Sequence, residues 1–316
     1  STTTLTAGGG ATYSWSPATG LSSTTGSSVA ANPASTTIYT VSGDNGSGCS
    51  TAATVTVTVN ATPVVSAGAG VNICAGSSTA LSATGATVYS WSPATGLTAT
   101  TGANVTSGPA ATTLYTVTGT SGAGCVGTAT VAVTVNAHPS ITSVGNNGPL
   151  CEGVDLTLTG AASGGSASYL YSWSGPNSFT SSLQNPVVTA ITSAGAGSYT
   201  LTLTDSNGCS APGSDSTTVT IILSPAMDSI GNSGPVCSGN DVAFHAAASG
   251  GTGTLSYLWS GPSLYSSSLQ NPVITAAGTT AGGTYSVSVT DANGCGATGA
   301  VVTTATVNPT PSAGTI

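Results

Sequence analysis

Seven cysteines are the residues of this sequence with the most definite chemistry. Six of them recur in pairs at similar separations, and none lies in a Cys-x-x-Cys motif, so disulfides are favoured over a zinc site. Disulfides indicate an oxidising, extracellular or cell-surface setting. Cys49 has no mate within its own repeat, and we predict that it is buried or pairs with a neighbouring segment or chain. Within the repeats the predicted disulfides are Cys74–Cys125, Cys151–Cys209 and Cys237–Cys295.

Two Asp-x-Asn-Gly-Cys segments offer oxygen ligands in a turn. Asp205 and Asn207 lie in the first, and Asp291 and Asn293 lie in the second, so these four residues are weak calcium candidates. The matching segment of another repeat, residues 121–125, has no acid. Asp and Asn also favour such turns without any ion, because their side chains bond to the backbone two residues on. Both interpretations stay open from the sequence.

Composition excludes several kinds of chemistry. The 316 residues include no Lys or Arg, eight acidic residues and two His. Without cations the chain cannot neutralise phosphates, so we expect no nucleic-acid partner. His138 and His245 are the available bases, and neither lies in a recognisable catalytic pattern, so we expect no enzyme activity and no cofactor. No apolar run reaches about 18 residues, so we expect no membrane insertion.

Internal repetition organises the sequence. Residues 13–21 recur as residues 89–97, and residues 184–187 recur as residues 270–273. Together with the recurring Cys, Trp and Pro positions, these copies define four repeats. The predicted domains are repeat 1 (1–61), repeat 2 (62–137), repeat 3 (138–223), repeat 4 (224–309), and a segment at 310–316 that begins a further repeat or serves as a donor strand.

Each repeat is predicted to be a small antiparallel β-sandwich. Residues 55–59, 131–135 and 285–289 alternate between Val or Tyr and the smaller residues Ala, Ser or Thr, which is typical of half-buried strands. Gly-Pro and Asn-Gly turns separate such segments. The fold class is therefore all-β, with four tandem immunoglobulin-like sandwiches arranged as a rod. Trp15, Trp91, Trp173 and Trp259 are predicted to lie one in each core, although exposed Trp residues could also stack on sugars.

The first repeat is predicted to lack its opening strand. If Cys74 is moved back by one repeat, it falls before Ser1, so Cys49 loses its expected mate. Residues 308–314, in contrast, resemble the beginning of a repeat at residues 62–68. Either the chain is a window from a longer array, or residues 310–316 of one copy complete the first repeat of the next copy by strand addition.

The Trp-Ser-Pro-Ala-Thr-Gly-Leu segments resemble the Ig-like and PKD-like repeats of giant secreted Bacteroidota surface proteins. The segments at 204–209 and 290–295 are similar to the closing motif of repeats in gliding-motility adhesins. The resemblance implies secretion, attachment to the cell surface and a role in adhesion or motility. The PKD signature Trp-Asp-Phe-Gly-Asp-Gly is absent from the sequence.

Two functions follow as expectations. The first is a structural one: an extracellular shaft of a filament or adhesin that self-associates head to tail or continues a longer array, since the scarcity of charge removes self-repulsion. The second is a glycan-binding module that contacts a glycan or surface ligand through Tyr169, Phe179 and Tyr265. Ser216 and Ser229 lie in segments that resemble bacterial O-glycosylation sites, and sugar there would improve solubility.

Overall fold

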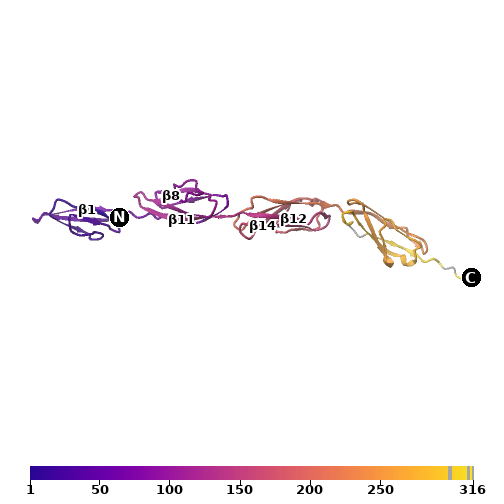
Figure 1. Ribbon diagram of the computed structural model, residues 1–316. Helices are drawn as coiled ribbons and strands as arrows, with labels where there is room; N and C mark the ends of the chain where they lie inside the picture. Colours follow the sequence, from indigo (N-terminus) through magenta and orange to yellow (C-terminus); the bar gives the residue numbers. More distant parts are fainter. Residues whose placement is uncertain (298–300, 312–313, 315–316) are drawn as a thin grey trace. The chain divides into compact units, whose positions relative to one another are not determined.

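The structure is a computed structural model that describes residues 1–297, 301–311 and 314. In this part of the chain the regular elements are β-strands and three short 3-10 segments, so the predicted all-β fold class is confirmed (Figure 1). The chain divides into two compact units, Ser1–Asn136 and Ala137–Ile316. The described residues form four hydrophobic cores, two in each unit and each built around one Trp. Of the predicted donor segment 310–316, residues 312, 313, 315 and 316 lie outside the described residues.

The second sandwich is the complete module of the first unit. Its strands are β6 (Val71–Cys74), β7 (Thr79–Ser82), β8 (Val88–Ser92), β9 (Asn104–Ser107), β10 (Thr113–Thr120) and β11 (Val126–Asn136). One sheet has the order β6-β11-β10-β8, and β7 pairs with β9 in the other. The opening segment is shared between the sheets: Ser66 bridges to Thr84 after β7, and β6 then runs parallel to β11. Alternation buries Tyr115 and Val117 completely against Trp91.

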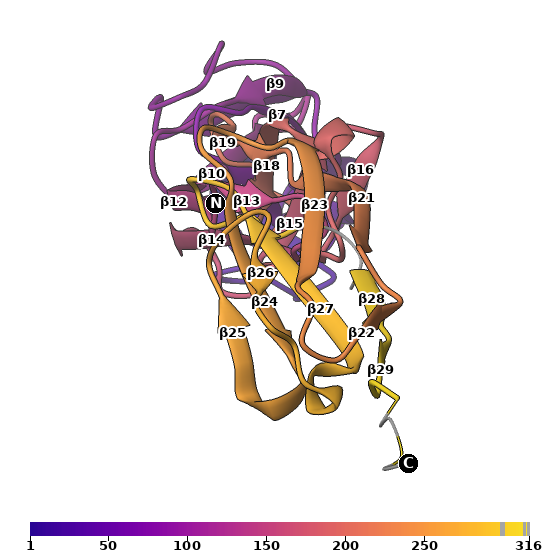
Figure 2. The same ribbon diagram turned by 90° about the vertical axis from the view of Figure 1, so that its right-hand side faces the viewer.

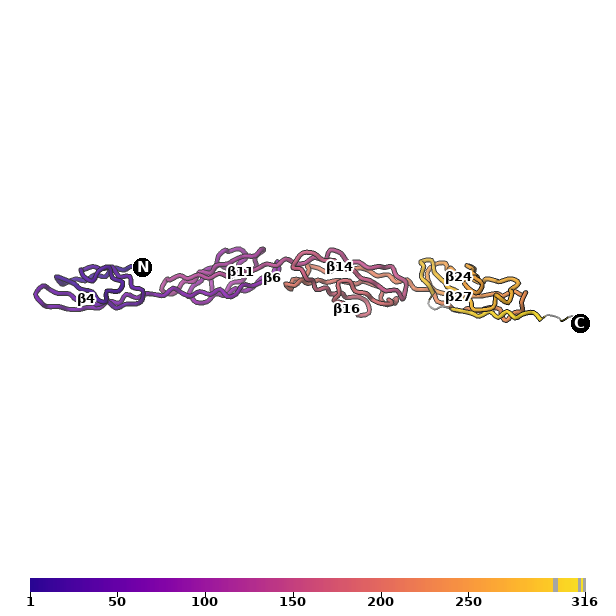
Figure 3. The backbone as a smooth tube through the Cα atoms, turned by 90° about the horizontal axis from the view of Figure 1, so that it is seen from below, coloured from indigo at the N-terminus to yellow at the C-terminus, as the bar shows by residue number. Residues whose placement is uncertain are grey.

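The first sandwich repeats this arrangement without its opening segment. Its strands are β1 (Thr3–Thr6), β2 (Thr12–Ser16), β3 (Ser28–Ala31), β4 (Thr37–Asp44) and β5 (Ser50–Val57). The sheets have the orders β1-β3 and β2-β4-β5. Within residues 1–61 no strand corresponds to β6, as the sequence predicted. In Figure 3 the N-terminus lies at the end of this sandwich where the chain continues into the second.

The third sandwich has two sheets that are joined by its own opening segment. Its elements are β12 (Pro139–Asn146), β13 (Leu150–Cys151), β14 (Leu156–Gly164), β15 (Leu170–Gly175), β16 (Phe179–Ser181), β17 (Val187–Val188), η1 (Ser193–Gly195), β18 (Gly197–Thr204), β19 (Asp215–Val219) and β20 (Ile221–Ile222). One sheet has the order β12-β14-β17 and the other β16-β15-β18-β19, while β13 runs parallel to β20.

The fourth sandwich has the same topology. Its elements are β21 (Pro225–Asn232), β22 (Val236–Cys237), β23 (Val242–Gly250), β24 (Ser256–Gly261), η2 (Pro262–Leu264), β25 (Tyr265–Ser267), β26 (Val273–Ile274), η3 (Thr279–Ala281), β27 (Gly283–Thr290), β28 (Val301–Ala305) and β29 (Val307–Asn308). Figure 2 shows β25, β24 and β27 side by side, with β23 and β21 in the second layer.

The four tryptophans lie in the cores, each between 0% and 4% exposed. A buried indole needs an acceptor for its N–H group. In every sandwich that acceptor is the backbone carbonyl eleven residues further on, for example Gly26 for Trp15 at 2.9 Å and Gln270 for Trp259 at 3.2 Å. These side chains are structural and are not available as sugar-stacking platforms.

Candidate functional site

The first cysteine of each complete repeat lies where the chain leaves its sandwich, which we call the outgoing end. Cys74 lies opposite Asn136 in the parallel pairing of β6 with β11. Cys151 lies opposite Ile222, and Cys237 lies opposite Asn308, in the corresponding pairs of the third and fourth sandwiches. In each case the partner residue is at the end of the last strand of that sandwich.

The second cysteine lies at the opposite end, which we call the incoming end. Cys209 follows the turn at Asp205, whose carboxylate accepts the amide N–H of Ser166 at 2.9 Å. This turn is near the start of β12, since Pro139 pairs with Gly164. In the second sandwich the Cys125 thiol lies 3.6 Å from the carbonyl oxygen of Asn60, in the linker that enters that sandwich.

Disulfides within one repeat are therefore excluded by geometry, and the pairing predicted from the sequence is wrong. Cys151 bonds to Cys295 of the next sandwich, with Cα atoms 5.5 Å apart. Cys125 and Cys237 carry free thiols, which contradicts the predicted Cys74–Cys125 and Cys237–Cys295 bonds. Cys74 and Cys209 are each disulfide-bonded. Cys49 is free and exposed in the single chain, not buried.

The sequence contained a signal that would have prevented this error. The opening segment of repeat 2 runs from Pro63 to Cys74, and the eleven steps between these twelve residues span about 36 Å in extended conformation. That length carries the cysteine along the whole sandwich to its outgoing end. The turn that holds the second cysteine precedes the last strand and stays at the incoming end, so the two cannot meet.

The calcium candidates are structural turn residues. Asp205 is 1% exposed and Asp291 is 5% exposed. Hydrogen bonds from the amides of Ser166, Cys209 and Asn207 lower the pKa of Asp205, the Ser166 bond most strongly and against the effect of burial. Burial raises the pKa of Asp291, but bonds from Thr252, Cys295, Asn293 and Gly294 lower it overall.

These backbone donors occupy both oxygens of each carboxylate. One oxygen of Asp291 accepts Thr252 N–H at 2.8 Å, and the other accepts Asn293 and Cys295 N–H at 2.9 and 2.8 Å. The carboxylates face N–H groups, and a cation would compete with these donors. Asn207 and Asn293 have exposed side chains. Among the described residues no group of three or more His, Cys, Asp or Glu is arranged to hold a metal ion.

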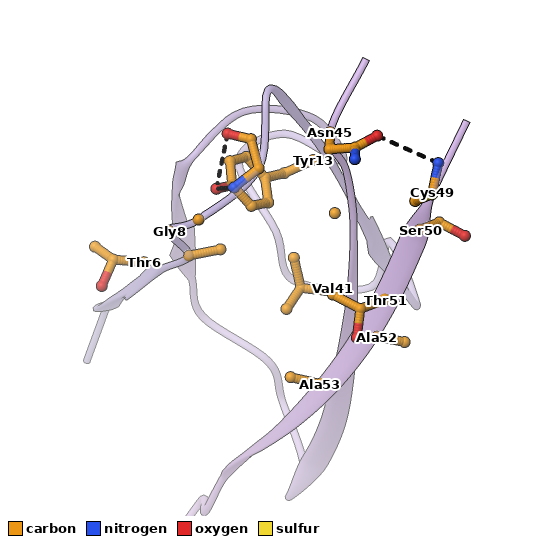
Figure 4. Close-up of a pocket in the computed structure, with 14 residues that line it drawn as sticks. Thr6, Gly8, Tyr13, Val41, Asn45, Cys49, Ser50, Thr51, Ala52 and Ala53 are labelled. Atoms are coloured by element: carbon orange, nitrogen blue, oxygen red, sulfur yellow. Dashed lines mark hydrogen bonds between the residues drawn. The ribbon is translucent and has the colours of Figure 1, made fainter. Parts of the chain in front are cut away.

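The first sandwich carries an open groove at its incoming end, which we call the turn-side groove. Figure 4 shows it between the residues after β1 and the hairpin of β4 and β5, with Tyr13 and Cys49 on opposite sides. Its volume is about 570 Å³. The lining residues are uncharged and small, apart from Tyr13 and Val41; they are Thr6–Gly10, Tyr13, Val41, Gly43, Asn45 and Cys49–Ala53.

The matching space in the second sandwich is filled by the opening segment. A side chain at Gly85 would clash with the carbonyl of Val64, and one at Gly119 would clash with the Val65 side chain. Gly9 corresponds to Gly85 and has almost the same φ, +96° against +97°, but nothing lies within 4 Å of its Cβ position. The first sandwich is thus shaped for a strand that residues 1–61 do not supply.

A second groove lies at the outgoing end, where Figure 3 places the N-terminus, and we call it the terminus-side groove. Its volume is about 850 Å³. It follows the free edge of the last part of the first sandwich, and the turn before β11 of the second sandwich closes one side. The lining residues are Ser1–Leu5, Asn32, Pro33, Val55–Asn60 and Ala123–Cys125. The corresponding edge of the second sandwich is covered by β6.

The aromatic residues expected for glycan binding do not form an exposed cluster. Tyr265 packs on the fourth core, with its ring centroid 5.4 Å from that of Tyr285. Phe179 packs on the third core, 5.4 Å from the Tyr199 ring. The hydroxyl of Tyr169 donates to the carbonyl of Gly164 at 2.7 Å. Tyr265 and Phe179 therefore close the edges of two cores.

The two glycosylation candidates lie on exposed strand positions. Ser216 is in β19 and Ser229 is in β21, next to an irregularity in the pairing of β21 with β23. Exposure allows a modifying enzyme to reach the hydroxyls, and modification at these sites stays a prediction. No helix in the described part of the chain has the length and apolarity needed to cross a membrane.

Comparison with known proteins gives similarity in solved structures only. No family model and no curated protein matches the chain. The I-band fragment I67–I69 of titin is 14% identical over 80% of this chain and all of that chain, with a TM-score of 0.49. The N-terminal eight Ig domains of DSCAM are 14% identical over 98% of this chain and 45% of that chain (TM-score 0.42). Three N-terminal domains of the outer capsid protein Hoc of bacteriophage RB49 are 14% identical over 79% of this chain and 99% of that chain (TM-score 0.35).

Proposed function

We propose that this chain is an extracellular structural segment, the shaft of a cell-surface filament or adhesin, whose modules are joined head to tail. The observation that carries the proposal is the Cys151–Cys295 disulfide, which connects the third sandwich to the fourth. A covalent bond beside the peptide linker transmits tension across the joint without unfolding either sandwich. A disulfide also fits an oxidising extracellular location.

Strand completion is the second part of the proposal. The turn-side groove has the shape and the uncharged lining of the site that residues 63–66 occupy in the second sandwich. Residues 310–316 of another copy have similar chemistry, with Thr310-Pro311 in place of Thr62-Pro63 and further small residues after it. Adding a strand would bury the free edge of the first sandwich, the feature that usually drives strand addition.

The test compares the full chain with a variant truncated after Asn308, which keeps β29 and its pairing with β22. The full chain should form end-to-end oligomers that grow with concentration in sedimentation velocity and electron microscopy. The truncated chain should stay monomeric, and an excess of a peptide of residues 308–316 should inhibit association of the full chain. Equal association of both chains, or monomers in both cases, would contradict strand completion.

The glycan-binding alternative has weaker support. It needs exposed aromatic rings, and two of its three candidates lie against hydrophobic cores. The structural function needs only the repeated sandwiches, their joint and the open edge of the first sandwich.

A further inference from the structure

We propose that the terminus-side groove and Cys125 form a covalent docking site for an extended polypeptide segment with the chemistry of residues 70–74, ending in a cysteine. The inference rests on the proposed strand completion and extends it. Residues 310–316 contain no cysteine and would fill the turn-side groove alone. A segment as long as residues 62–74 would continue along the sandwich, as that segment does in the second sandwich, and would be fixed at the outgoing end by a disulfide to the second sandwich.

The last residue of β5 and the three residues after it provide the backbone partners for such a segment. In the second sandwich, Val133 to Asn136 pair in parallel with Val71 to Cys74. One repeat earlier, the equivalent residues 57–60 line the groove and pair with no strand on that side among residues 1–136. A segment added in the same register would place its cysteine opposite Asn60.

The side chains along this edge lack the cover that their counterparts have. Val55 is 37% exposed, whereas Val131, its equivalent in the second sandwich, is 3% exposed. Val59 is 38% exposed. In the second sandwich Ile73 of β6 is buried and contributes to the core. The edge of the first sandwich therefore favours an apolar, β-branched, uncharged segment.

Cys125 lies at the place where the cysteine of the docked segment would end. The expected register sets that cysteine opposite Asn60, and the Cys125 sulfur is 3.6 Å from the carbonyl oxygen of Asn60. Cys125 is a free, partly exposed thiol that lines the groove. The two sulfur atoms would thus be neighbours without a change in the fold.

The third and fourth sandwiches already contain a bond of this type. Cys151 lies opposite the end of the last strand of the third sandwich. The cysteine of the docked segment would occupy the same position in the first sandwich. Its partner Cys295 follows a turn at the incoming end of the fourth sandwich, as Cys125 does in the second. The same two positions, one repeat apart, are therefore known to bond within this chain.

The chemistry is ordinary thiol–disulfide exchange. The Cys125 thiolate attacks the sulfur of a segment whose cysteine is held as a mixed disulfide with a small thiol such as glutathione. The new sulfur–sulfur bond forms as the old one breaks, and the small thiol leaves with the electron pair and takes up a proton. The oxidant is the disulfide form of that small thiol, as in an oxidising compartment.

The experiment uses the full chain and a peptide of residues 62–75, which contains the opening strand and Cys74 of repeat 2. Both are incubated in a glutathione redox buffer and digested with pepsin, because the chain has no site for trypsin. Mass spectrometry then locates the peptide. Cys49 and Cys237 are free and exposed and serve as internal controls.

We expect the peptide on Cys125 in at least about tenfold excess over the two control thiols, because docking raises its effective concentration into the millimolar range. A peptide with Val71→Asp and Ile73→Asp should lose this preference while its thiol stays intact. Equal labelling of the three thiols, or preference for the more exposed Cys49 and Cys237, would overturn the proposal.

A second peptide, carrying Cys74→Ser, separates the two hypotheses. Suppose that both peptides bind the chain and that the cysteine peptide forms no disulfide with Cys125. That result refutes the covalent site and leaves strand completion standing. If neither peptide binds, the docking site at the free edge of the first sandwich is refuted, and the peptide of residues 308–316 tests strand completion by residues 310–316 separately. A Cys125→Ser chain should bind the cysteine peptide without forming the adduct at this position.

Discussion

Breaking the bond between the third and fourth sandwiches should lower the stability of both. Cys151→Ser is the appropriate change, because Cys151 is only partly buried whereas its partner Cys295 is fully buried. The matched control is Cys237→Ser, at the equivalent position of the fourth sandwich, where the thiol is exposed and free.

The size of the effect follows from the loop that the bond closes. Consider the state in which the fourth sandwich is unfolded and the third is folded. Cys151 is then held opposite Ile222 in the third sandwich. The Cys151–Cys295 bond therefore closes a loop of about 70 residues, from Ile222 to Cys295, in the unfolded fourth sandwich. In the chain-entropy description such a loop contributes about 4 kcal/mol at 25 °C. The Cys237→Ser change removes no bond and should stay within about 0.5 kcal/mol.

Hydrogen exchange resolves the effect by position. The slowest amides of β24 and β27 should lose about a thousandfold in protection in the Cys151→Ser variant, the factor that corresponds to 4 kcal/mol. The slowest amides of β10, in the other unit, should keep their protection. Unchanged protection in the fourth sandwich, or an equal loss in the Cys237→Ser control, would refute the explanation based on loop closure.

Three further outcomes test the roles assigned above. Backbone amides lower the folded pKa of Asp205 and Asp291, so the stability that these two carboxylates contribute is present above the unfolded pKa of about 3.9 and is lost as the pH falls below it. The urea midpoints of the third and fourth sandwiches should therefore fall more between about pH 5 and pH 2 than the midpoint of the second. An equal fall in all three sandwiches would contradict this. Val131→Thr should lower the free energy of unfolding by about 1–2 kcal/mol, because Val131 is buried. Val55→Thr, at the open edge of the first sandwich, should lower it by less than about 0.5 kcal/mol. Equal losses would mean that this edge is not open. Tyr265→Ala should destabilise the fourth sandwich by about 2–3 kcal/mol in urea denaturation, and full stability with loss of glycan binding would favour the alternative function.

The repeats and the strand class could be predicted because they depend on local pattern. Alternating residues such as those at 131–135 predict an extended strand with its Val side chains on one face, whatever the neighbouring repeat does. The recurring Trp needs a large apolar site, which each small sandwich supplies once. That residues 1–61 contain no counterpart of β6 was also visible, since it is a matter of counting positions against repeat 2.

The disulfides could not be assigned in the same way, because similar separations along the chain do not say at which end of a sandwich each cysteine lies. Cys151 and Cys209 belong to one repeat, but the parallel strand β13 carries Cys151 to the outgoing end and the Asp205 turn keeps Cys209 at the incoming end. Sequence alone therefore determined the modules and their composition. Tertiary structure decided which modules are bonded and where the first is open, because a bond requires two sulfur atoms to meet in space and the direction of the opening strand sets where they are.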